Sequence, residues 1–379
     1  MAHNPRYLRR LLLIAAAAAF IYIQVRLFST QSSQDAGRVL HAEADQPDLP
    51  VAAVVIMACN RPDYLQRTVE SILKYQKAVA SKFPLFISQD GTNGEVKNKA
   101  LSYAQITFMQ HVDLEPVHTE SPGENIAYYK IANHYKWALD ELFIKHNFGR
   151  VIILEDDMEI APDFFDYFEA AAKLLDTDKY VTTKQFVYDP KALYRSDFFP
   201  GLGWMLTKST WMELSPKWPK AYWDDWVRLK EVHGGRQFIR PEVCRTYNFG
   251  EHGSSMGQFF DQYLKPIKLN NAHIDWNSED LSYLTEDKFL IKFGKDVANA
   301  TPVRGSDDLL KAHNLDVDVR IQYNDQSDFE RVARQFGVFE EWKDGVPRAA
   351  YKGVVVFRYE SSRRRIYLVG PDSLRQLGV

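Results

Sequence analysis

Three consecutive carboxylates, Glu155, Asp156 and Asp157, follow an apolar run at residues 151–154. The run is rich in β-branched residues and is typical of a buried parallel strand. In open α/β sheets ligands lie beyond the carboxyl ends of the strands, and divalent cations take oxygen ligands and bridge to substrate phosphates. Because burying three acids is costly unless a cation meets them, the stretch predicts a metal-assisted nucleotide site. The alternative is a solvated turn before a helix that begins at Asp163, which explains one acid but not three.

A second pair of acids, Asp224 and Asp225, lies among three tryptophans and one tyrosine within residues 218–226. Aromatic rings pack against the apolar faces of sugars, while carboxylates bind hydroxyl groups. An apolar setting also raises the pKa of a carboxylate, which suits a general base. The stretch therefore indicates a sugar site with a base. The alternative is an aromatic core cluster whose two acids cap a helix.

Two glycine-containing stretches lie on either side of these acids. Residues 198–204 place two glycines between large aromatic side chains, which allows the backbone to approach a ligand closely. Residues 249–257 are rich in glycine and serine and are suited to closing over a diphosphate through backbone N–H groups. The second signal is weak by itself, because its spacing matches no P-loop.

Composition excludes some classes of function. The chain of 379 residues is 45% hydrophobic and 13% aromatic, so it has enough apolar side chains for a sizeable core. Its formal net charge of -3 argues against a nucleic-acid-binding surface. Both cysteines, Cys59 and Cys244, lie in apolar, strand-like surroundings, which predicts two buried thiols. A disulfide between them is the alternative, and their spacing offers no zinc site.

The N-terminus has the pattern of a membrane anchor. Arginines at positions 6, 9 and 10 precede an apolar run at residues 11–25. Flanking arginines can snorkel, so a run slightly short of the usual length can still span a thin membrane. The positive charge before the run predicts a cytoplasmic tail at 1–10, a transmembrane signal anchor at 11–28 and a flexible lumenal stem at 29–50. A cleaved signal peptide is the alternative.

The body of the chain begins with alternating strand and helix patterns, which predict a parallel sheet. A long helix at 123–146 precedes the acidic strand, and its apolar residues keep a 3.6-residue period. His134 lies beside this apolar face, and its spacing alone favours a packed core histidine over a ligand. Another helix is expected at 162–175. The first expected elements are strands at 51–58, 83–88 and 106–111 and helices at 62–75 and 97–104.

The predicted fold class is α/β. Residues 51–270 are expected to form a Rossmann-like mixed sheet with its helices, and residues 271–379 a smaller α+β portion. The elements expected in that portion are a strand at 317–323, a helix at 328–335 and a hairpin-like pair at 354–359 and 364–369.

Several segments resemble, in the same order, those of the N-acetylglucosaminyltransferase I family. Their amino-acid sequences are similar to those of plant members. The resemblance extends from about residue 51 to the C-terminus, and so many long motifs in one order make it specific. It implies a GT-A glycosyltransferase fold. The segments that carry it are residues 54–61, 88–90, 129–137, 155–157, 198–204, 217–226 and 257–260.

The resemblance also implies an activity and a location. The expected enzyme is inverting: it moves GlcNAc from UDP-GlcNAc in β1,2 linkage to the α1,3-linked mannose of the five-mannose N-glycan, with Mn²⁺ as cofactor. Its product starts hybrid and complex N-glycan synthesis. The family leads us to expect a single-pass type II protein of the Golgi membrane, with its catalytic domain in the lumen, that associates with other Golgi glycosylation enzymes.

The resemblance assigns roles residue by residue. Asp157 is implied to hold the metal, Asp156 to bind the ribose and Glu155 to bind the sugar side of the donor. Asp224 is implied to be the general base. The remaining substrate-binding residues that it implies are Arg61, Asp90 and His134 for the nucleotide and Ser255 for the donor phosphates.

One departure from the family pattern concerns the region after the helix at 162–175. The family continues there with a segment that reads like Ser-Ser-Trp-Asn-Asp-Asn-Gly, whereas residues 178–187 join the helix directly to later sequence. We therefore expect a short internal deletion near residues 181–184, which removes a strand and an active-site loop. The alternative function that follows is a catalytically impaired isoform, or a non-enzymatic Golgi glycan-binding protein.

Overall fold

The computed structural model describes residues 49–379 except 176–180, 183–188, 255, 258–259, 306–316 and 360–363. The expected cytoplasmic tail, membrane anchor and nearly all of the stem therefore lie outside the described residues. Residues 50–379 form one compact unit. Within the described ranges, no helix combines the length and the hydrophobicity needed to cross a bilayer.

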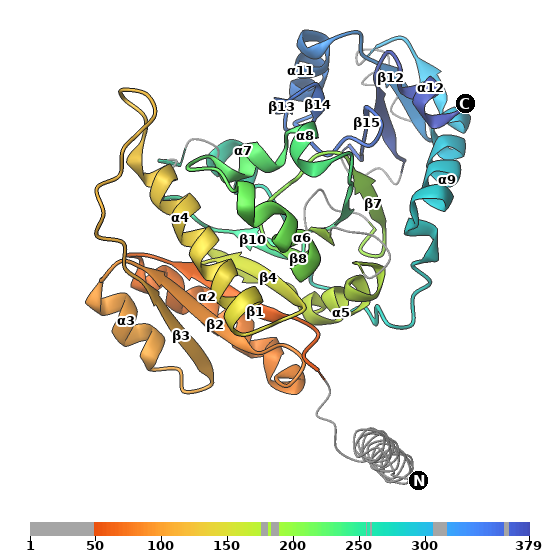
Figure 1. Ribbon diagram of the computed structural model, residues 1–379. Helices are drawn as coiled ribbons and strands as arrows, with labels where there is room; N and C mark the ends of the chain where they lie inside the picture. Colours follow the sequence, from red (N-terminus) through yellow and green to blue (C-terminus); the bar gives the residue numbers. More distant parts are fainter. Residues whose placement is uncertain are drawn as a thin grey trace, which may run out of the picture. The chain divides into compact units, whose positions relative to one another are not determined.

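A mixed eight-stranded sheet forms the centre of this unit, in the order β3-β2-β1-β4-β8-β6-β9-β7 (Figure 1). The first four strands in this order are parallel, which confirms the parallel sheet predicted from the alternating patterns. Strand β8 then pairs antiparallel with β4 and makes the sheet mixed. The strands are β1 (Ala53–Ala58), β2 (Leu85–Asp90), β3 (Ile106–His111), β4 (Arg150–Glu155), β6 (Val181–Thr182), β7 (Leu193–Ser196), β8 (Trp204–Thr207) and β9 (Phe238–Pro241).

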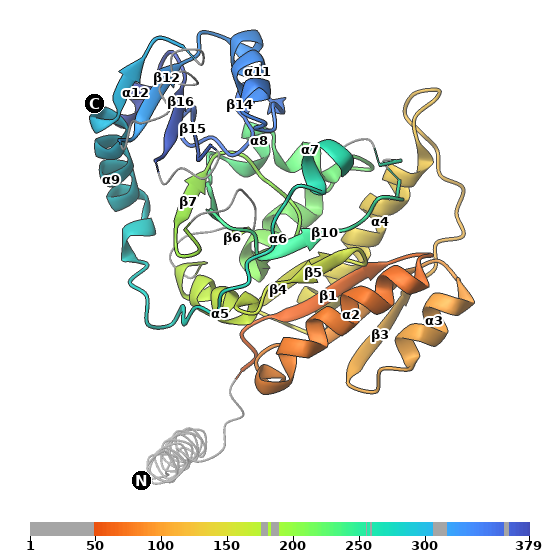
Figure 2. The same cartoon turned by 180° about the vertical axis from the view of Figure 1, so that it is seen from behind.

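Helices cover both faces of this sheet, because each central strand is apolar on both sides. Alternate residues of β1 point to opposite faces: Val54 and Ile56 join one hydrophobic cluster, and Ala53 and Val55 join the other. Figures 1 and 2 show these two faces from opposite sides. The first cluster contains residues of α2 (Pro62–Gln76), α3 (Gly94–Leu101) and α5 (Phe164–Leu175), and the second contains residues of α4 (Ile126–Asp140) and α6 (Lys208–Leu214).

Helix ends differ from the predicted ones where a side chain caps the backbone. Helix α3 begins before the predicted residue 97 because Asn93 accepts a hydrogen bond from the N–H of Val96 at 3.0 Å. The predicted helix at 123–146 was wrong at its start, because Asn125 caps α4 through the N–H of Ala127 at 3.0 Å. Its end was also irregular, since α4 continues as a π-helical turn, Glu141–Lys145.

A second, four-stranded sheet lies in the C-terminal part, in the order β11-β12-β16-β15. Strands β15 and β16 pair antiparallel, as their hairpin-like pattern predicted. Helices α9, α11 and α12 accompany this sheet (Figure 1). Their bounds are β11 (Thr301–Val303), β12 (Val319–Gln322), β15 (Val354–Phe357), β16 (Ile366–Val369), α9 (Glu286–Asn299), α11 (Gln326–Gln335) and α12 (Ser373–Leu377).

Several short elements lie outside the two larger sheets, and α7 and β10 among them contribute to the candidate site. Strand β5 pairs antiparallel with β10, and β13 with β14. These elements are β5 (Met158–Ile160), β10 (Thr246–Asn248), β13 (Trp342–Lys343), β14 (Val346–Pro347), α7 (Trp223–Val227), α8 (Lys230–His233), a π-helical turn Phe260–Leu264, and 3-10 turns Lys77–Val79, Ser215–Lys217 and Ser282–Leu284.

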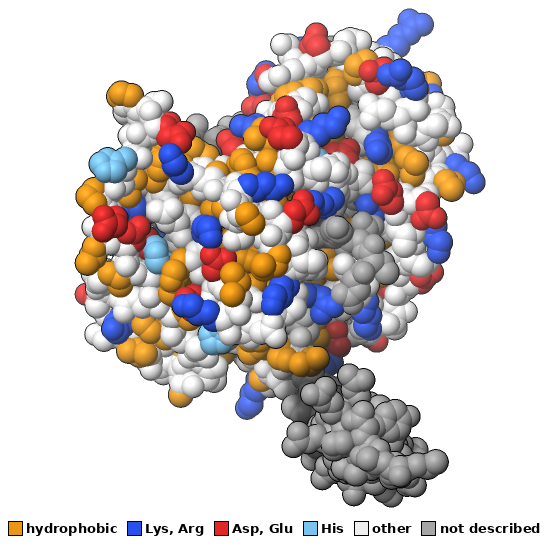
Figure 3. All heavy atoms as spheres, in the orientation of Figure 1, with side chains coloured by type: hydrophobic (Ala, Val, Ile, Leu, Met, Phe, Trp, Pro, Cys, Tyr) orange, Lys and Arg blue, Asp and Glu red, His pale blue; other side chains and the backbone are white. Residues whose placement is uncertain are grey.

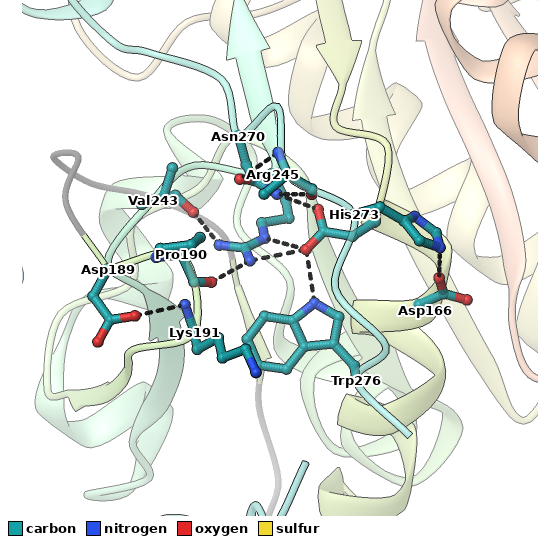
Figure 4. A network of polar contacts seen from close by, with 11 residues as sticks. Asp166, Asp189, Pro190, Lys191, Val243, Arg245, Asn270, His273 and Trp276 are labelled. Carbon is teal, nitrogen blue, oxygen red and sulfur yellow. Dashed lines mark hydrogen bonds and ion pairs between the residues drawn. The ribbon is translucent and has the colours of Figure 1, made fainter. Parts of the chain in front are cut away.

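A buried ion pair joins the helix after the acidic strand to more distant parts of the chain (Figure 4). Arg245 Nη2 lies 2.9 Å from Oδ2 of Asp163, and both side chains are fully buried. Trp276 donates to the same oxygen at 2.8 Å, and Asn270 donates to Oδ1 at 2.7 Å. Asp163 is therefore a structural anchor, because every partner compensates the cost of burying its charge.

The two cysteines are not joined by a disulfide, and they differ in exposure. Cys244 is buried as predicted, whereas Cys59 is exposed. The prediction of two buried thiols was wrong for Cys59 because β1 ends at Ala58, so Cys59 lies just beyond the covered part of the strand.

Basic and acidic side chains are interspersed over the described residues on the face shown in Figure 3. The near balance of 47 basic and 50 acidic residues agrees with this mixed surface. That face therefore carries no extended field of one sign.

Candidate active site

The acidic triplet lies at the carboxyl edge of the parallel strands. Strand β4 ends at Glu155, and the N–H of Asp156 donates to the carbonyl of Met57 in neighbouring β1 at 3.0 Å. Asp156 and Asp157 are only 2% and 7% exposed. The triplet is therefore not a solvated turn, and the alternative that relied on one is wrong.

Arg61 supplies the cation that the buried acids require. It follows the end of β1 and is the N-cap residue of α2. Its Nη2 pairs with Oδ1 of Asp156 and lies 2.9 Å from Oδ2 of Asp157. Its Nη1 donates to the carbonyl of His252 at 2.8 Å. One guanidinium thus joins two acids of the triplet to the loop at 249–257.

The charges of this cluster do not cancel. Burial raises the pKa of Glu155, and the charge of Asp157 raises it further. Burial also raises the pKa values of Asp156 and Asp157, although Arg61 opposes that rise. Burial lowers the pKa of Arg61, but the two aspartates raise it above its ordinary value overall. Three carboxyl groups around one guanidinium therefore form a site that a further cation would stabilise.

The backbone of Gly250 packs closely against the carboxylate of Asp157. Asn248 donates to Oδ1 of Asp157 at 2.9 Å. A Cβ added to Gly250 would lie 2.8 Å from Cγ of Asp157 and closer still to Oδ2, so only glycine allows this close approach. Within the described ranges, no three His, Cys, Asp or Glu side chains are grouped to hold a metal by themselves. Asp157 therefore suits a cation that takes most of its ligands from a bound substrate and water.

Tyr135 lies between the acidic triplet and Asp224. Its hydroxyl donates to Oε1 of Glu155 at 2.9 Å, and its ring stacks on Trp223 with centroids 4.5 Å apart. Burial raises the pKa of Tyr135, and the charges of Glu155, Asp157 and Asp224 raise it further. Because Tyr135 contacts both Glu155 and Trp223, the residue before Asp224, it brings Asp224 near the triplet although they are 67 or more residues apart in sequence.

Asp224 is presented at the first turn of α7. Its carboxylate is 44% exposed, and its Oδ2 lies 3.2 Å from Nη1 of Arg228. Asp225 is engaged through both oxygens, by Arg228 at 2.9 Å and by Lys343 at 3.1 Å. Among the ion pairs of the described residues, Asp224 uses only Oδ2. Asp224 is thus held in place while its other oxygen stays available to a substrate.

The aromatic residues around these acids differ in exposure. Trp223 is buried and stacks on Tyr135, Trp204 and Trp218, so the interpretation as a sugar platform was wrong for this ring. It packs inward because α7 begins directly after Tyr222, whose φ of 51° turns the chain. Tyr222 is the exposed aromatic residue next to Asp224.

Asp90 and His134 lie together at the end of β2. His111 Nδ1 lies 2.7 Å from Oδ1 of Asp90, and its ring stacks on that of His134 with centroids 5.7 Å apart. His134 is buried and forms a 2.8 Å hydrogen bond with Ser88. Cys59 follows β1, which lies between β2 and β4 in the sheet, so it lies between this pair and the acidic triplet.

Most of the predicted site residues therefore gather at one edge of the sheet. Ser255 lies outside the described residues. Sequence reasoning missed Asn248, Gly250 and Tyr135 as parts of the site. Their signals were positional: Tyr135 follows His134 directly, and Asn248 precedes the glycine- and serine-rich loop that contains Gly250.

We expect His134 to make the protein sensitive to acid. Burial lowers the pKa of His134 from 6.5 to about 4, although Asp90 opposes the shift. The unfolded chain therefore takes up this proton first, and stability is lost as the pH falls from 6.5 towards 4. Relative to His134→Gln, the wild-type protein should lose about 3 kcal/mol of unfolding free energy between pH 7 and pH 4. Urea unfolding at both pH values measures this difference, and a constant difference would contradict the expectation.

Likenesses to solved structures are weak. One is to the mannosyltransferase PcManGT from Pyrobaculum calidifontis in complex with GDP-Man and Mn²⁺, with TM-score 0.36, 16% identity, and coverage of 53% of this chain and 58% of that one. The other is to a fragment of S. aureus TarS in complex with UDP-GlcNAc, with TM-score 0.37, 12% identity, and coverage of 66% and 67%. At these scores we infer nothing from them.

Sequence comparisons are far stronger. The chain is 59% identical to the alpha-1,3-mannosyl-glycoprotein 2-beta-N-acetylglucosaminyltransferase of Arabidopsis thaliana, over 98% of each chain. The aligned region spans 434 residues, against 379 in this chain, so the relative contains at least 55 that this chain lacks. The deletion expected near residues 181–184 falls partly on residues 183–188, which lie outside the described ranges.

The sequence model of the GNT-I family matches residues 29–379. This match covers the acidic edge of the sheet, α7 and the C-terminal part alike. The chain belongs to the GNT-I family.

Proposed function

We propose that this chain is an inverting glycosyltransferase of GT-A architecture. It moves GlcNAc from UDP-GlcNAc in β1,2 linkage to the α1,3-linked mannose of the five-mannose N-glycan, and so starts hybrid and complex N-glycan synthesis. Membership of the GNT-I family and the name of the Arabidopsis relative support this activity. The observation that carries it is that Tyr135 contacts both Glu155 of the acidic triplet and Trp223, the residue before Asp224. Arg61 pairs with the other two acids of the triplet.

The donor site is built for a nucleotide diphosphate and a divalent cation. Asp157 would hold Mn²⁺, and Gly250 lets its carboxylate keep the position that this requires. When bound, the ion offsets the negative charge that develops on the departing UDP. Asp156 would bind the ribose, and Glu155, oriented by Tyr135, would face the sugar. Asp90 and His134 would contact the remainder of the nucleotide.

Asp224 acts as the general base of the transfer. It accepts the proton of the mannose 2-hydroxyl as that oxygen bonds to the anomeric carbon of GlcNAc. The bond from this carbon to the UDP oxygen breaks on the opposite face, and its electrons leave with UDP. One displacement inverts the centre, so an α-linked donor gives a β-linked product. Arg228 fixes Oδ2 of Asp224, which leaves Oδ1 to receive the proton.

The location that we propose rests on the N-terminal sequence. Arginines before the apolar run at 11–25 favour a single-pass type II orientation with the body in the lumen. The acceptor and the donor then assign the protein to the Golgi membrane, together with other enzymes of N-glycan synthesis.

Transfer should depend on a divalent cation. We expect the full chain to transfer GlcNAc from UDP-GlcNAc to the five-mannose glycan with Mn²⁺, to lose this activity in EDTA, and to recover it when Mn²⁺ is restored. Mass spectrometry of the glycan measures the added GlcNAc. Equal activity in EDTA would contradict the role of Asp157.

A second candidate function follows from the residues that the Arabidopsis protein has and this chain lacks. A chain without part of its catalytic domain would bind the donor without turning it over. A chimera with the Arabidopsis sequence in place of residues 176–188 separates the two functions. UDP binding by both proteins with transfer by the chimera alone would favour the impaired form, whereas transfer by both would favour the active enzyme.

A further inference from the structure

A pocket of about 490 Å³ lies beside the C-terminal sheet, outside the cluster of catalytic residues described above. Three segments form it: the π-helical turn Phe260–Leu264, the start of α11, and residues 339–342 before β13. Its volume lies in the range of small-molecule sites. The side chains that carry the argument are Gln262, Tyr263, Gln326, Phe339, Glu341 and Trp342.

The lining determines which class of ligand fits. Amide and carboxylate groups pair with hydroxyls as donors and acceptors, while the three aromatic rings offer apolar faces. No lysine or arginine and no aliphatic side chain lines the pocket in the described part of the chain. Anions such as the donor diphosphate and purely apolar ligands are therefore disfavoured. A neutral, hydroxyl-rich molecule with apolar C–H faces is the best match, which is the chemistry of a pyranose.

The walls of the pocket are held in place by contacts among the lining residues. The rings of Tyr263 and Phe339 stack with centroids 3.8 Å apart and an angle of 10° between their planes. The hydroxyl of Tyr263 donates to Glu340. Gln326 donates from its amide to Glu330 at 2.8 Å, which fixes the first turn of α11. The segments are thus joined before any ligand arrives, which lowers the entropic cost of binding.

One guanidinium links the pocket to the proposed base. Oε1 of Glu341, which lines the pocket, lies 3.3 Å from Nη1 of Arg228. The same Nη1 lies 3.2 Å from Oδ2 of Asp224. Gln262 and Tyr263 also follow the loop whose Gly250 and His252 lie against Asp157 and Arg61. A sugar in the pocket would therefore lie near the acceptor side of the reaction.

We propose that this pocket is a second acceptor subsite, which binds a mannose of the acceptor glycan other than the one that reacts. The inference rests on the proposed function for its choice of glycan. It adds a site that recognises the size of the acceptor, because a short acceptor would reach Asp224 without reaching the pocket. Binding energy from a remote sugar then selects the branched glycan.

The double substitution Gln262→Ala with Gln326→Ala tests this site. Both side chains are exposed, so the fold should tolerate their loss. Removing two sugar hydrogen bonds should weaken binding of the five-mannose glycan about tenfold. Calorimetry of the full chain with UDP and Mn²⁺ present measures this affinity, and UDP affinity should stay unchanged. Gln322→Ala, an exposed glutamine on β12 that does not line the pocket, is the matched control.

Transfer kinetics give a second measurement. The double variant should show a raised KM for the five-mannose glycan, with kcat and the KM for an α1,3-mannosyl disaccharide unchanged. Unchanged glycan affinity, or equal losses with the disaccharide and in the Gln322→Ala control, would overturn the proposal. If the proposed function were wrong, the wild-type chain would transfer GlcNAc to neither acceptor. The calorimetric measurement of glycan affinity would still test the pocket in that case.

Discussion

Asp224→Asn should lower kcat for GlcNAc transfer about 10³-fold, since general-base catalysis contributes an effect of this size. The amide has nearly the same shape as the carboxylate but cannot accept the proton of the mannose hydroxyl. The KM for UDP-GlcNAc should change little, because Asp224 faces the acceptor while the donor is assigned to the acidic triplet. A quench assay with radiolabelled UDP-GlcNAc at saturating donor measures the loss.

Asp225→Asn is the matched control for this prediction. The two acids are neighbours on α7 and both contact Nη1 of Arg228, at 3.2 Å for Asp224 and 2.9 Å for Asp225. Asp225 also pairs with Lys343, so its role is to hold the helix. We expect this variant to keep most of its turnover and to lose some thermal stability. Equal losses of kcat in the two variants would refute the assignment of the base.

The parts of this fold that could be predicted from sequence depend on neighbours along the chain. The parallel strands follow from apolar runs that alternate with helix patterns, and the acidic triplet follows β4 directly. Burial of both faces of the strands leaves little choice of sheet type. Because the carboxyl ends of parallel strands lie at one edge of a sheet, the edge at which the acids gather could be predicted from the sequence alone.

The parts that could not be predicted depend on contacts between distant segments. Gly250 matters because it lies against Asp157, which is 93 residues earlier in the sequence. Nothing in the sequence singled out Tyr135 as a site residue, although its hydroxyl reaches Glu155. Trp223 was expected to face a sugar, but tertiary packing against Trp204 and Tyr135 buries it. Periodicity shows which face of a helix is apolar. It does not show which residue the hydroxyl of a tyrosine on that face will contact.

Arg61 illustrates how the same physics determines stability and function. Its guanidinium compensates two buried carboxylates when no other cation is present. A divalent cation at Asp157 would share this task with Arg61 and favour the charged state of all three acids. The site thus tolerates its own charge without a ligand, and the cation that we propose would bind there without a dedicated protein cage.

Gly250→Ala should reduce kcat/KM for transfer about 10²-fold, because a displacement near 1 Å at a reacting site has this effect. The added Cβ would lie 2.8 Å from Cγ of Asp157, which is too close for the carboxylate to keep its position. Asp157 would then have to move away from both Arg61 and Asn248. We expect weaker binding of Mn²⁺ with UDP by calorimetry, and a higher Mn²⁺ concentration for half-maximal transfer.

Gly253→Ala in the same loop supplies the control. A Cβ at this position would lie 3.5 Å from Nη1 of Arg61, which is ordinary van der Waals contact, so the loop can accept it. Both substitutions remove the same backbone freedom from the unfolded chain, so the change in stability that arises from the unfolded state should be the same for both. A difference between the two variants therefore measures the space beside Asp157 alone. If both lost activity equally, loop flexibility rather than the clearance at Asp157 would be the property that Gly250 provides.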